Sequence, residues 1–195
     1  MQLSDLDLSK TYSYADYLQW TFEDRLELIK GKIFKMTPAP NLYHQEISTI
    51  ISGELYNFLK GKPCRVFSAP FDVRLSCKSD EIKEKKIYTV VQPDVCVVCS
   101  PLKLDSRGCT GAPDIVVEIL SPGNNEKELR NKYEVYEESG ISEYWLISPQ
   151  DKTFFKYTLI EGHYQPSRLM TIGDMITTPI LPGFELNLET VFAGI

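Results

Sequence analysis

The stretch "DIVVEILSPG", residues 114–123, decides how the rest of the chain is interpreted. It is a run of β-branched and aliphatic residues, with Pro113 before it and Pro122 and Gly123 after it, which is typical of a buried strand. Glu118 lies near the middle of this strand. Because an unpaired carboxylate is costly inside a protein, we expect Glu118 to be protonated, paired or bound to a cation.

The residues after this strand predict a parallel crossover. Residues 125–139 are predicted to be helical, because Leu129, Tyr133 and Tyr136 fall on one face and Gly140 follows. The segment "EYWLIS" (143–148) is predicted as the next strand. A strand, helix, strand passage of this length favours a parallel pair, and therefore a mixed sheet.

Two further strands are predicted before residue 114. They are "RVFSAPFDVRL" (65–75) and "YTVVQPDVCVVC" (88–99). Between them, the charged residues 76–87 are predicted as an exposed turn, and the Gly- and Pro-containing residues 100–113 as a loop.

The N-terminal third predicts a hairpin between two helices. Residues 11–24 predict a short helix, and "RLELIKGKIFKM" (25–36) alternates around Lys30-Gly31 as a two-residue hairpin does. After an extended "TPAP" linker (37–40), apolar residues predict a helix that Gly61 and Pro63 end. Its stripe contains Ile47, Ile50, Ile51, Leu55, Phe58 and Leu59.

The C-terminal segments "TFFKYTL", "GHYQ" and "ILPGFELNL" predict further strands that complete one domain, residues 1–195. With 195 residues, 22.3 kDa and 43% hydrophobic residues, the chain has enough apolar side chains for one substantial core. The acidic N-terminus lacks an apolar export segment, and no apolar run is long enough for a bilayer. We therefore expect no membrane association and a cytoplasmic protein.

Cysteine and charge narrow the function classes. Five scattered cysteines are a poor disulfide framework and favour a reducing cytoplasm. Cys96 and Cys99 form a CxxC without a second pair, so zinc is not expected. The net charge of -6 argues against broad, nonspecific affinity for nucleic acid, although a local basic cleft is compatible with it.

Two carboxylates are the candidate chemical centre. Strand alternation places Gln92, Asp94 and Cys96 on one face, and Val116, Glu118 and Leu120 on one face of the later strand. If the strands are neighbours, Asp94 and Glu118 converge and repel each other unless a cation such as Mg²⁺ or Mn²⁺ lies between them. Lys132, beside the apolar stripe of the following helix, could reach these carboxylates and stabilise negative charge on a phosphate.

The chain resembles a known family through several ordered motifs. These are "ELIKGKIFKMTPAP" followed by His44, "QPDVCVV", "APDIVVEILSPG", "KELRNKYEVYEESGISEYWLISP" and "LPGFELNL". From about Tyr14 to the C-terminus they are similar to the Uma2 family of the PD-(D/E)XK restriction-endonuclease-like superfamily.

The resemblance implies an α/β fold with a restriction-endonuclease-like core, in which helices flank a central mixed sheet, plus an N-terminal hairpin and C-terminal strands. It implies that Asp94 and Glu118 are the metal ligands. Leu120 occupies the position of the usual lysine, and Lys132 on the next helix replaces it. Glu27 and His44 match further motif positions around the same cleft, where Gln92 also belongs. The chain departs from the family pattern at Glu128 and Lys32, which puts only supporting contacts in doubt.

Ordinary structural roles remain open for the same residues. Asp94 could cap a turn, and Glu118 could pair with an arginine. Lys132 could make a surface pair with Glu128. For Glu128 itself, a capping role after Asn125 is favoured. His44 could be a packed histidine, and Glu27 could pair with Arg25 on the strand surface. The aromatic residues Tyr133, Tyr136, Tyr144 and Trp145 are most simply core residues.

The sequence thus predicts a Mg²⁺- or Mn²⁺-dependent endonuclease that hydrolyses phosphodiester bonds of nucleic acid, with DNA expected. Asp94, Glu118 and Lys132 are its predicted catalytic residues, supported by Glu27, His44 and Gln92. The alternative is a noncatalytic nuclease-fold module that binds nucleic acid or protein. A homodimer is compatible with an enzyme that must cut two strands.

Overall fold

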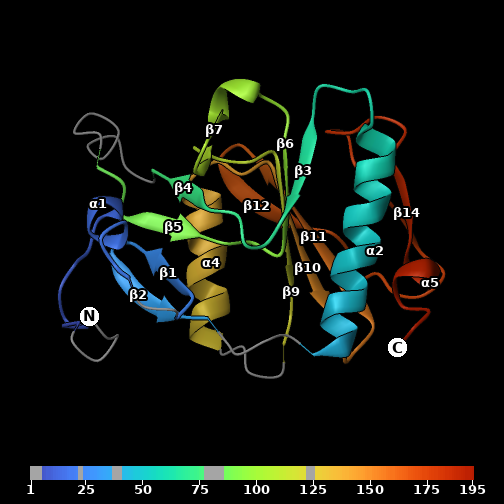
Figure 1. Cartoon of the computed structure of the whole chain (residues 1–195). Helices are drawn as coiled ribbons and strands as arrows, with labels where there is room; N and C mark the ends of the chain where they lie inside the picture. Colours follow the sequence, from blue (N-terminus) through green and yellow to red (C-terminus); the bar gives the residue numbers. More distant parts are fainter. Residues whose placement is uncertain (1–5, 22–23, 37–40, 77–85, 122–125) are drawn as a thin grey trace.

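In the computed structural model of the protein, most strands belong to two six-stranded sheets (Figure 1). The structure describes residues 6–21, 24–36, 41–76, 86–121 and 126–195. The predicted linker at 37–40, most of the predicted turn at 76–87, the predicted cap at Asn125 and the side chain of Glu128 lie outside the described residues.

The central sheet contains the predicted buried strand that carries Glu118. Its strand order is β12-β11-β10-β9-β6-β3. The bounds are β3 (Arg65–Ser68), β6 (Val95–Val98), β9 (Ile115–Ile119), β10 (Glu143–Ser148), β11 (Thr153–Ile160) and β12 (His163–Pro166). The strands β9 and β10 are parallel and joined through α4 (Glu126–Glu138), whereas the other neighbours are antiparallel. The predicted crossover and mixed sheet are therefore confirmed.

The second sheet, called the hairpin sheet below, has the order β2-β1-β5-β4-β8-β7. The bounds are β1 (Leu26–Ile29), β2 (Lys32–Lys35), β4 (Val73–Leu75), β5 (Thr89–Val91), β7 (Leu104–Asp105) and β8 (Gly108–Thr110). Lys30 and Gly31 both have positive φ, 52° and 77°, which is the two-residue turn that the sequence predicts. Residues 100–113 are predicted as a loop but contain regular secondary structure, namely η2 (Pro101–Lys103), β7 and β8.

Two predicted strands are wrong in the same way, because each is divided between the two sheets. Residues 65–75 form β3 of the central sheet and β4 of the hairpin sheet, and residues 88–99 form β5 and β6. Each break contains a proline, Pro70 or Pro93, which has no N–H to donate to a sheet. The two breaks are neighbours, since the Ala69 N–H donates to the Asp94 carbonyl at 3.0 Å.

Helices cover both faces of the central sheet. The predicted long helix is confirmed as α2 (Leu42–Leu59), in which Asn41 caps the N-terminus by accepting from the His44 N–H. The predicted first helix is shorter than expected, since α1 spans only Tyr14–Tyr17. The remaining elements are β13 (Met175–Thr177), β14 (Glu185–Asn187) and α5 (Leu188–Val191).

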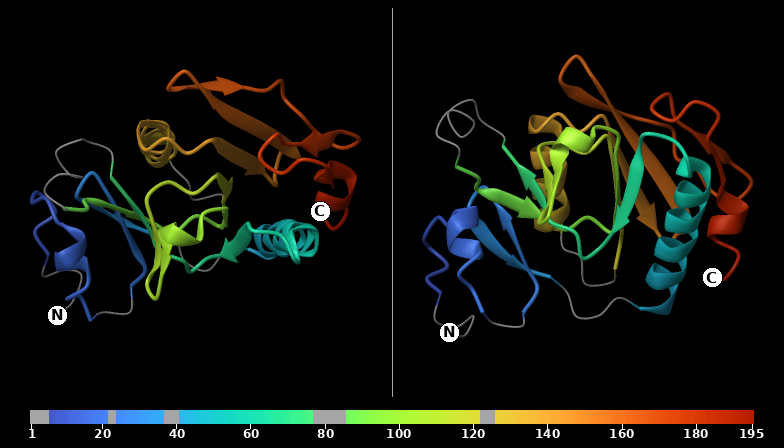
Figure 2. Two further views of the ribbon diagram at one scale, coloured as in Figure 1. Left: turned by 90° about the horizontal axis from the view of Figure 1, so that it is seen from above. Right: turned by 45° about the horizontal axis from the view of Figure 1, so that its top comes forward.

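The packing follows strand alternation. One face of the central sheet, with Val117 and Trp145, packs on α2 and the C-terminal segment. The other face, with Val116 and Tyr144, packs on α4 and on residues of the hairpin sheet such as Val91. Figure 2 shows α2 and α4 on opposite sides of the central sheet. Glu118 shares the face of Val116, which directs it toward α4.

The expectation about cysteine is wrong for one pair, because Cys64 and Cys99 form a disulfide. The strands β3 and β6 are antiparallel, with Arg65 opposite Val98, so the residues just outside this pair meet. Two other thiols, of Cys96 and Cys109, are free and buried. Within the described part of the chain, no helix has the length and apolar character needed to cross a membrane.

Candidate active site

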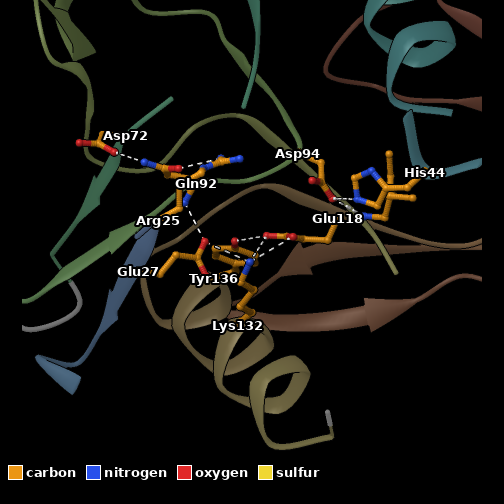
Figure 3. Close-up of polar contacts among 10 residues, drawn as sticks. Arg25, Glu27, His44, Asp72, Gln92, Asp94, Glu118, Lys132 and Tyr136 are labelled. Atoms are coloured by element: carbon orange, nitrogen blue, oxygen red, sulfur yellow. Dashed lines mark hydrogen bonds and ion pairs between the residues drawn. The ribbon is translucent and has the colours of Figure 1, made fainter. Parts of the chain in front are cut away.

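The candidate site lies where the chain twice passes between the two sheets. The first break leaves Asp72 next to β4, and the second leaves Gln92 and Asp94 between β5 and β6. Because β6 pairs with β9, with Val95 opposite Val117, Asp94 lies beside the end of β9 that carries Glu118. The folding of the two sheets thus collects polar residues at one place (Figure 3).

Glu118 is buried and ion-paired. The Lys132 ammonium lies 3.0 and 3.2 Å from the two Glu118 carboxylate oxygens, and 3.1 Å from Oε1 of Glu27. All three side chains are at most 10% exposed. Lys132 reaches the site from α4 and Glu27 from β1, so this lysine joins the helix, the central sheet and the hairpin sheet.

Tyr136 completes this cluster, since its hydroxyl donates to Oε1 of Glu118 at 2.5 Å. It lies four residues after Lys132 on α4, and residues with this spacing project from one helical face. The prediction that Tyr136 is a core residue is confirmed, since its ring is fully buried. Its hydroxyl was missed; the available signal was a tyrosine, rather than a phenylalanine, one turn after the lysine.

Burial and charge oppose each other in this cluster. Burial raises the pKa of Glu118, the Lys132 ammonium lowers it, and the negative charges of Asp94 and Glu27 raise it again, so that the pKa lies at about 7. For Lys132, burial alone would lower the pKa, but the carboxylates of Glu118 and Glu27 outweigh it and raise the pKa. The ammonium is therefore held in its charged form between two carboxylates.

Asp94 forms the second half of the site. Its Oδ2 accepts from the Ile119 N–H of β9 at 2.7 Å and lies 3.2 Å from Nε2 of His44. His44 is buried in the first turn of α2, and its Nδ1 has no hydrogen-bond partner among the described residues. With Nε2 donating to Asp94, His44 fixes this carboxylate from the α2 side.

Gln92 lies at the centre of a third set of contacts. Its backbone N–H donates to Oε1 of Glu27 at 2.8 Å. Its side-chain Oε1 accepts from the Arg25 guanidinium at 2.9 Å, and its Nε2 donates to Oδ1 of Asp72 at 2.8 Å. The strand break at Pro93 turns Gln92 toward Arg25 and Asp72, so the predicted common face of Gln92 and Asp94 is wrong.

Arg25 and Asp72 were not among the predicted site residues. Arg25 was considered only as a surface partner of Glu27, and Asp72 falls in a segment predicted as continuous strand. The signal that was available is the proline in each divided strand, since a proline marks where a strand leaves its sheet.

A cavity of about 130 Å³ opens beside Asp94. Arg25 and Met36 line it from the hairpin, and His44 and Ser48 line it from α2. Ser121, just after β9, lines this cavity and also a neighbouring one of about 560 Å³. The site is thus reached through a cleft between the hairpin and α2.

The structure can be compared with the ordinary structural roles that the sequence leaves open for these residues. Lys132 is buried and pairs with Glu118 and Glu27, which is not the environment of a surface residue. Glu27 is also buried, so the surface pair with Arg25 is wrong. Glu118 does form an ion pair, but with a lysine instead of an arginine. The carboxylate of Asp94 bonds to β9 across the sheet.

Comparison with a solved structure defines the class of protein. The fold matches that of "a putative nuclease belonging to DUF820" from Anabaena variabilis, with a TM-score of 0.73 and 20% identity. The match covers 93% of this chain and 97% of that one. The chain therefore has the same mixed α/β fold, with helices that flank a central mixed sheet, as the sequence predicts.

Sequence comparison then gives the family. The chain belongs to the Uma2 family, because the family model described as "Putative restriction endonuclease" matches residues 14–189. An uncharacterized protein from Synechocystis is 29% identical over 139 residues, which is 70% of this chain and 68% of that protein.

Proposed function

We propose that this protein is a metal-dependent endonuclease that hydrolyses phosphodiester bonds of nucleic acid, with DNA as the expected substrate. The observation that carries the proposal is the convergence of Asp94, Glu118 and Lys132 beside a cleft, with Asp94 just before β6 and Glu118 on the neighbouring strand β9. Membership in a family described as restriction endonucleases supports the same conclusion.

The residues fit Mg²⁺ or Mn²⁺ in donor type and in charge. Asp94, Glu118 and Glu27 bring three negative charges against the single positive charge of Lys132, which is a net deficit that a divalent cation would offset. Mg²⁺ commonly uses one or two carboxylates and completes its coordination with water and phosphate oxygens. Asp94 and Glu118 would hold it. The ion would supply an activated water and neutralise charge on the phosphate.

Lys132 has two roles in this proposal. Without a cation its ammonium pairs with Glu118 and Glu27 and reduces the cost of burying them. With a cation held by Glu118, Lys132 would share these carboxylate oxygens with it. Lys132 would keep its contact with Glu27 and would have a donor for negative charge on the phosphate. Tyr136 keeps Glu118 in place through both states by its hydroxyl.

One observation favours the alternative, a noncatalytic module that binds nucleic acid or protein. Among the described residues, no group of three or more His, Cys, Asp or Glu side chains is arranged to hold a metal ion. Both oxygens of Glu118 already accept from Lys132. A protein that used this cluster only for stability would show the same contacts.

Cleavage assays separate the two. Supercoiled and linear DNA, and RNA, are incubated with wild type, Asp94→Ala and Glu118→Gln in Mg²⁺, in Mn²⁺ and in EDTA. We expect wild type to cleave only with metal and both variants to lose cleavage. Glu143→Gln is the matched control, since Glu143 is also a buried glutamate of the central sheet. It lies at the first residue of β10 and accepts a hydrogen bond from the Trp145 indole. Cleavage by Asp94→Ala, or binding without cleavage by wild type, would support the alternative. Sedimentation of the same samples tests whether the protein forms a homodimer, which would suit an enzyme that cuts two strands.

A further inference from the structure

Arg25 is the residue of this cleft whose charge the proposed chemistry leaves unexplained. It precedes β1, is exposed, and lines the cavity of about 130 Å³ together with His44 and Asp94. Among the described residues that line this cavity, Arg25 is the only lysine or arginine. The charge of its guanidinium thus faces the entrance to the two carboxylates.

Two hydrogen bonds in sequence hold the guanidinium. The Arg25 guanidinium donates to Oε1 of Gln92 at 2.9 Å, and Gln92 Nε2 donates to Oδ1 of Asp72 at 2.8 Å (Figure 3). The backbone N–H of Gln92 is fixed by Glu27. Gln92 is therefore held at two other points, by Glu27 and by Asp72, and can orient Arg25.

The chemical nature of this support matters. Gln92 is neutral, so it orients the guanidinium without neutralising it. Within the described part of the chain, no carboxylate forms an ion pair with Arg25. By contrast, Arg74 pairs with Asp105 at 2.7 Å and Arg168 pairs with Asp174. A guanidinium has five N–H donors, of which the contact with Gln92 uses one, and Arg25 lines the cavity in which the others can meet a ligand.

We propose that Arg25 binds a phosphate of the nucleic-acid backbone next to the bond that is cut, and that Gln92 and Asp72 position it. This inference rests on the proposed function. Arginine suits this role because its planar fork matches two phosphate oxygens. Its charge also counters the repulsion that Asp94, Glu118 and Glu27 exert on an approaching phosphate.

The first test measures binding without cleavage, using short fluorescein-labelled DNA and RNA in EDTA over a range of salt concentrations. Arg25→Ala should weaken binding about tenfold at low salt, which corresponds to the loss of one charged hydrogen-bonded contact. The slope of log K against log salt should become shallower by about 0.9 for duplex DNA, the value for one phosphate. Lys35→Ala is the matched control, because Lys35 lies on the same hairpin, is 61% exposed and pairs with Asp24. Its binding and slope should remain those of wild type.

The second test places a negative charge next to Arg25 without changing the net charge of the protein. In the double variant Gln92→Glu with Asp72→Asn, both hydrogen bonds can form, but a carboxylate now neutralises Arg25. We expect this variant to bind as weakly as Arg25→Ala. Circular dichroism and melting temperature show that each variant is folded.

The outcomes separate this inference from the proposed function. If wild type cleaves nucleic acid with metal but Arg25→Ala retains the wild-type slope, the role of Arg25 is overturned and the proposed function stands. If the Arg25-dependent slope is found without metal-dependent cleavage, phosphate binding stands and the proposed catalysis fails. Wild-type binding by the folded double variant, or no binding of DNA or RNA by wild type, overturns the inference.

Discussion

Replacing Lys132 by methionine tests whether a buried ammonium holds this site together. The substitution keeps the length of the side chain and removes the charge that lies 3.0 Å from Glu118 and 3.1 Å from Glu27. Two ionised carboxylates are then left in a place where the side chains are at most 10% exposed. Such an unbalanced buried cluster is strongly unfavourable.

The expected loss is about 3 to 5 kcal/mol, the cost of removing one partner of a buried ion pair, because Lys132 pairs with two buried carboxylates. Glu118, whose pKa is already raised by burial, can then take up a proton and donate to Glu27. For a chain of this size, the melting temperature should fall by about 10 °C.

The loss should depend on pH with a definite sign. The folded-state pKa of Glu118 is already raised to about 7 in wild type, and it should rise further without the ammonium. A raised pKa gives stability that is present below about pH 4.3 and is lost as the pH rises through the folded-state value. Wild type and Lys132→Met should therefore differ most above pH 7, and the difference should shrink as the pH falls toward 7, by up to about 1.4 kcal/mol per pH unit.

Urea unfolding at pH 7 and at a mildly alkaline pH measures both quantities. Adding Glu118→Gln to Lys132→Met should recover most of the stability, since one carboxylate then disappears with the ammonium. Lys35→Met, at an exposed ion pair, should cost well under ~1 kcal/mol at either pH. A loss below ~1 kcal/mol for Lys132→Met, equal at both pH values, would refute the buried cluster.

Three further predictions concern the same site. Lys132→Ala should lower turnover by about 10²- to 10³-fold without loss of Mn²⁺ affinity, because the ammonium is not a ligand and shares the Glu118 oxygens with the ion; calorimetry and cleavage rates on one preparation check this, and full activity would contradict it. Mg²⁺ or Mn²⁺ should raise the melting temperature of wild type but not of Glu118→Gln, and equal shifts in differential scanning fluorimetry would argue against the proposed metal site. Tyr136→Phe should cost about 1.5 to 3 kcal/mol in urea unfolding because Glu118 loses a buried donor, whereas Tyr133→Phe on the same helix should cost less, and equal costs would rule out a special role for the Tyr136 hydroxyl.

Local pattern was sufficient for the elements that carry the site. The alternation around Lys30-Gly31 predicts the β1–β2 hairpin, and the apolar run at 114–120 predicts β9 with Glu118 inside it. Helical spacing predicts α4, and a passage of this length predicts the parallel pair of β9 and β10. These predictions succeed because hydrogen bonds along a helix, turn conformations and strand alternation depend on residues close together in the chain.

The divided strands show where local pattern stops. Residues 65–75 and 88–99 each look like one strand, because every residue pattern within them is extended. Only the pairing of β3 with β6 and of β4 with β5 shows that each segment serves two sheets. The same long-range pairing brings Cys64 opposite Cys99, which no cysteine spacing indicates.

The partners of the candidate site were likewise decided by tertiary structure. The sequence by itself determined that Glu118 is buried in a strand and needs a partner, and the family resemblance pointed to Lys132, Glu27 and His44. Which atoms meet depends on contacts between residues far apart in the chain: Lys132 with Glu27, His44 with Asp94, and Arg25 with Gln92. Burial then selects among the possible partners, because a charge removed from water must find its counter-charge within a few ångströms, and only the packing of α4 between the two sheets fixes which one is there.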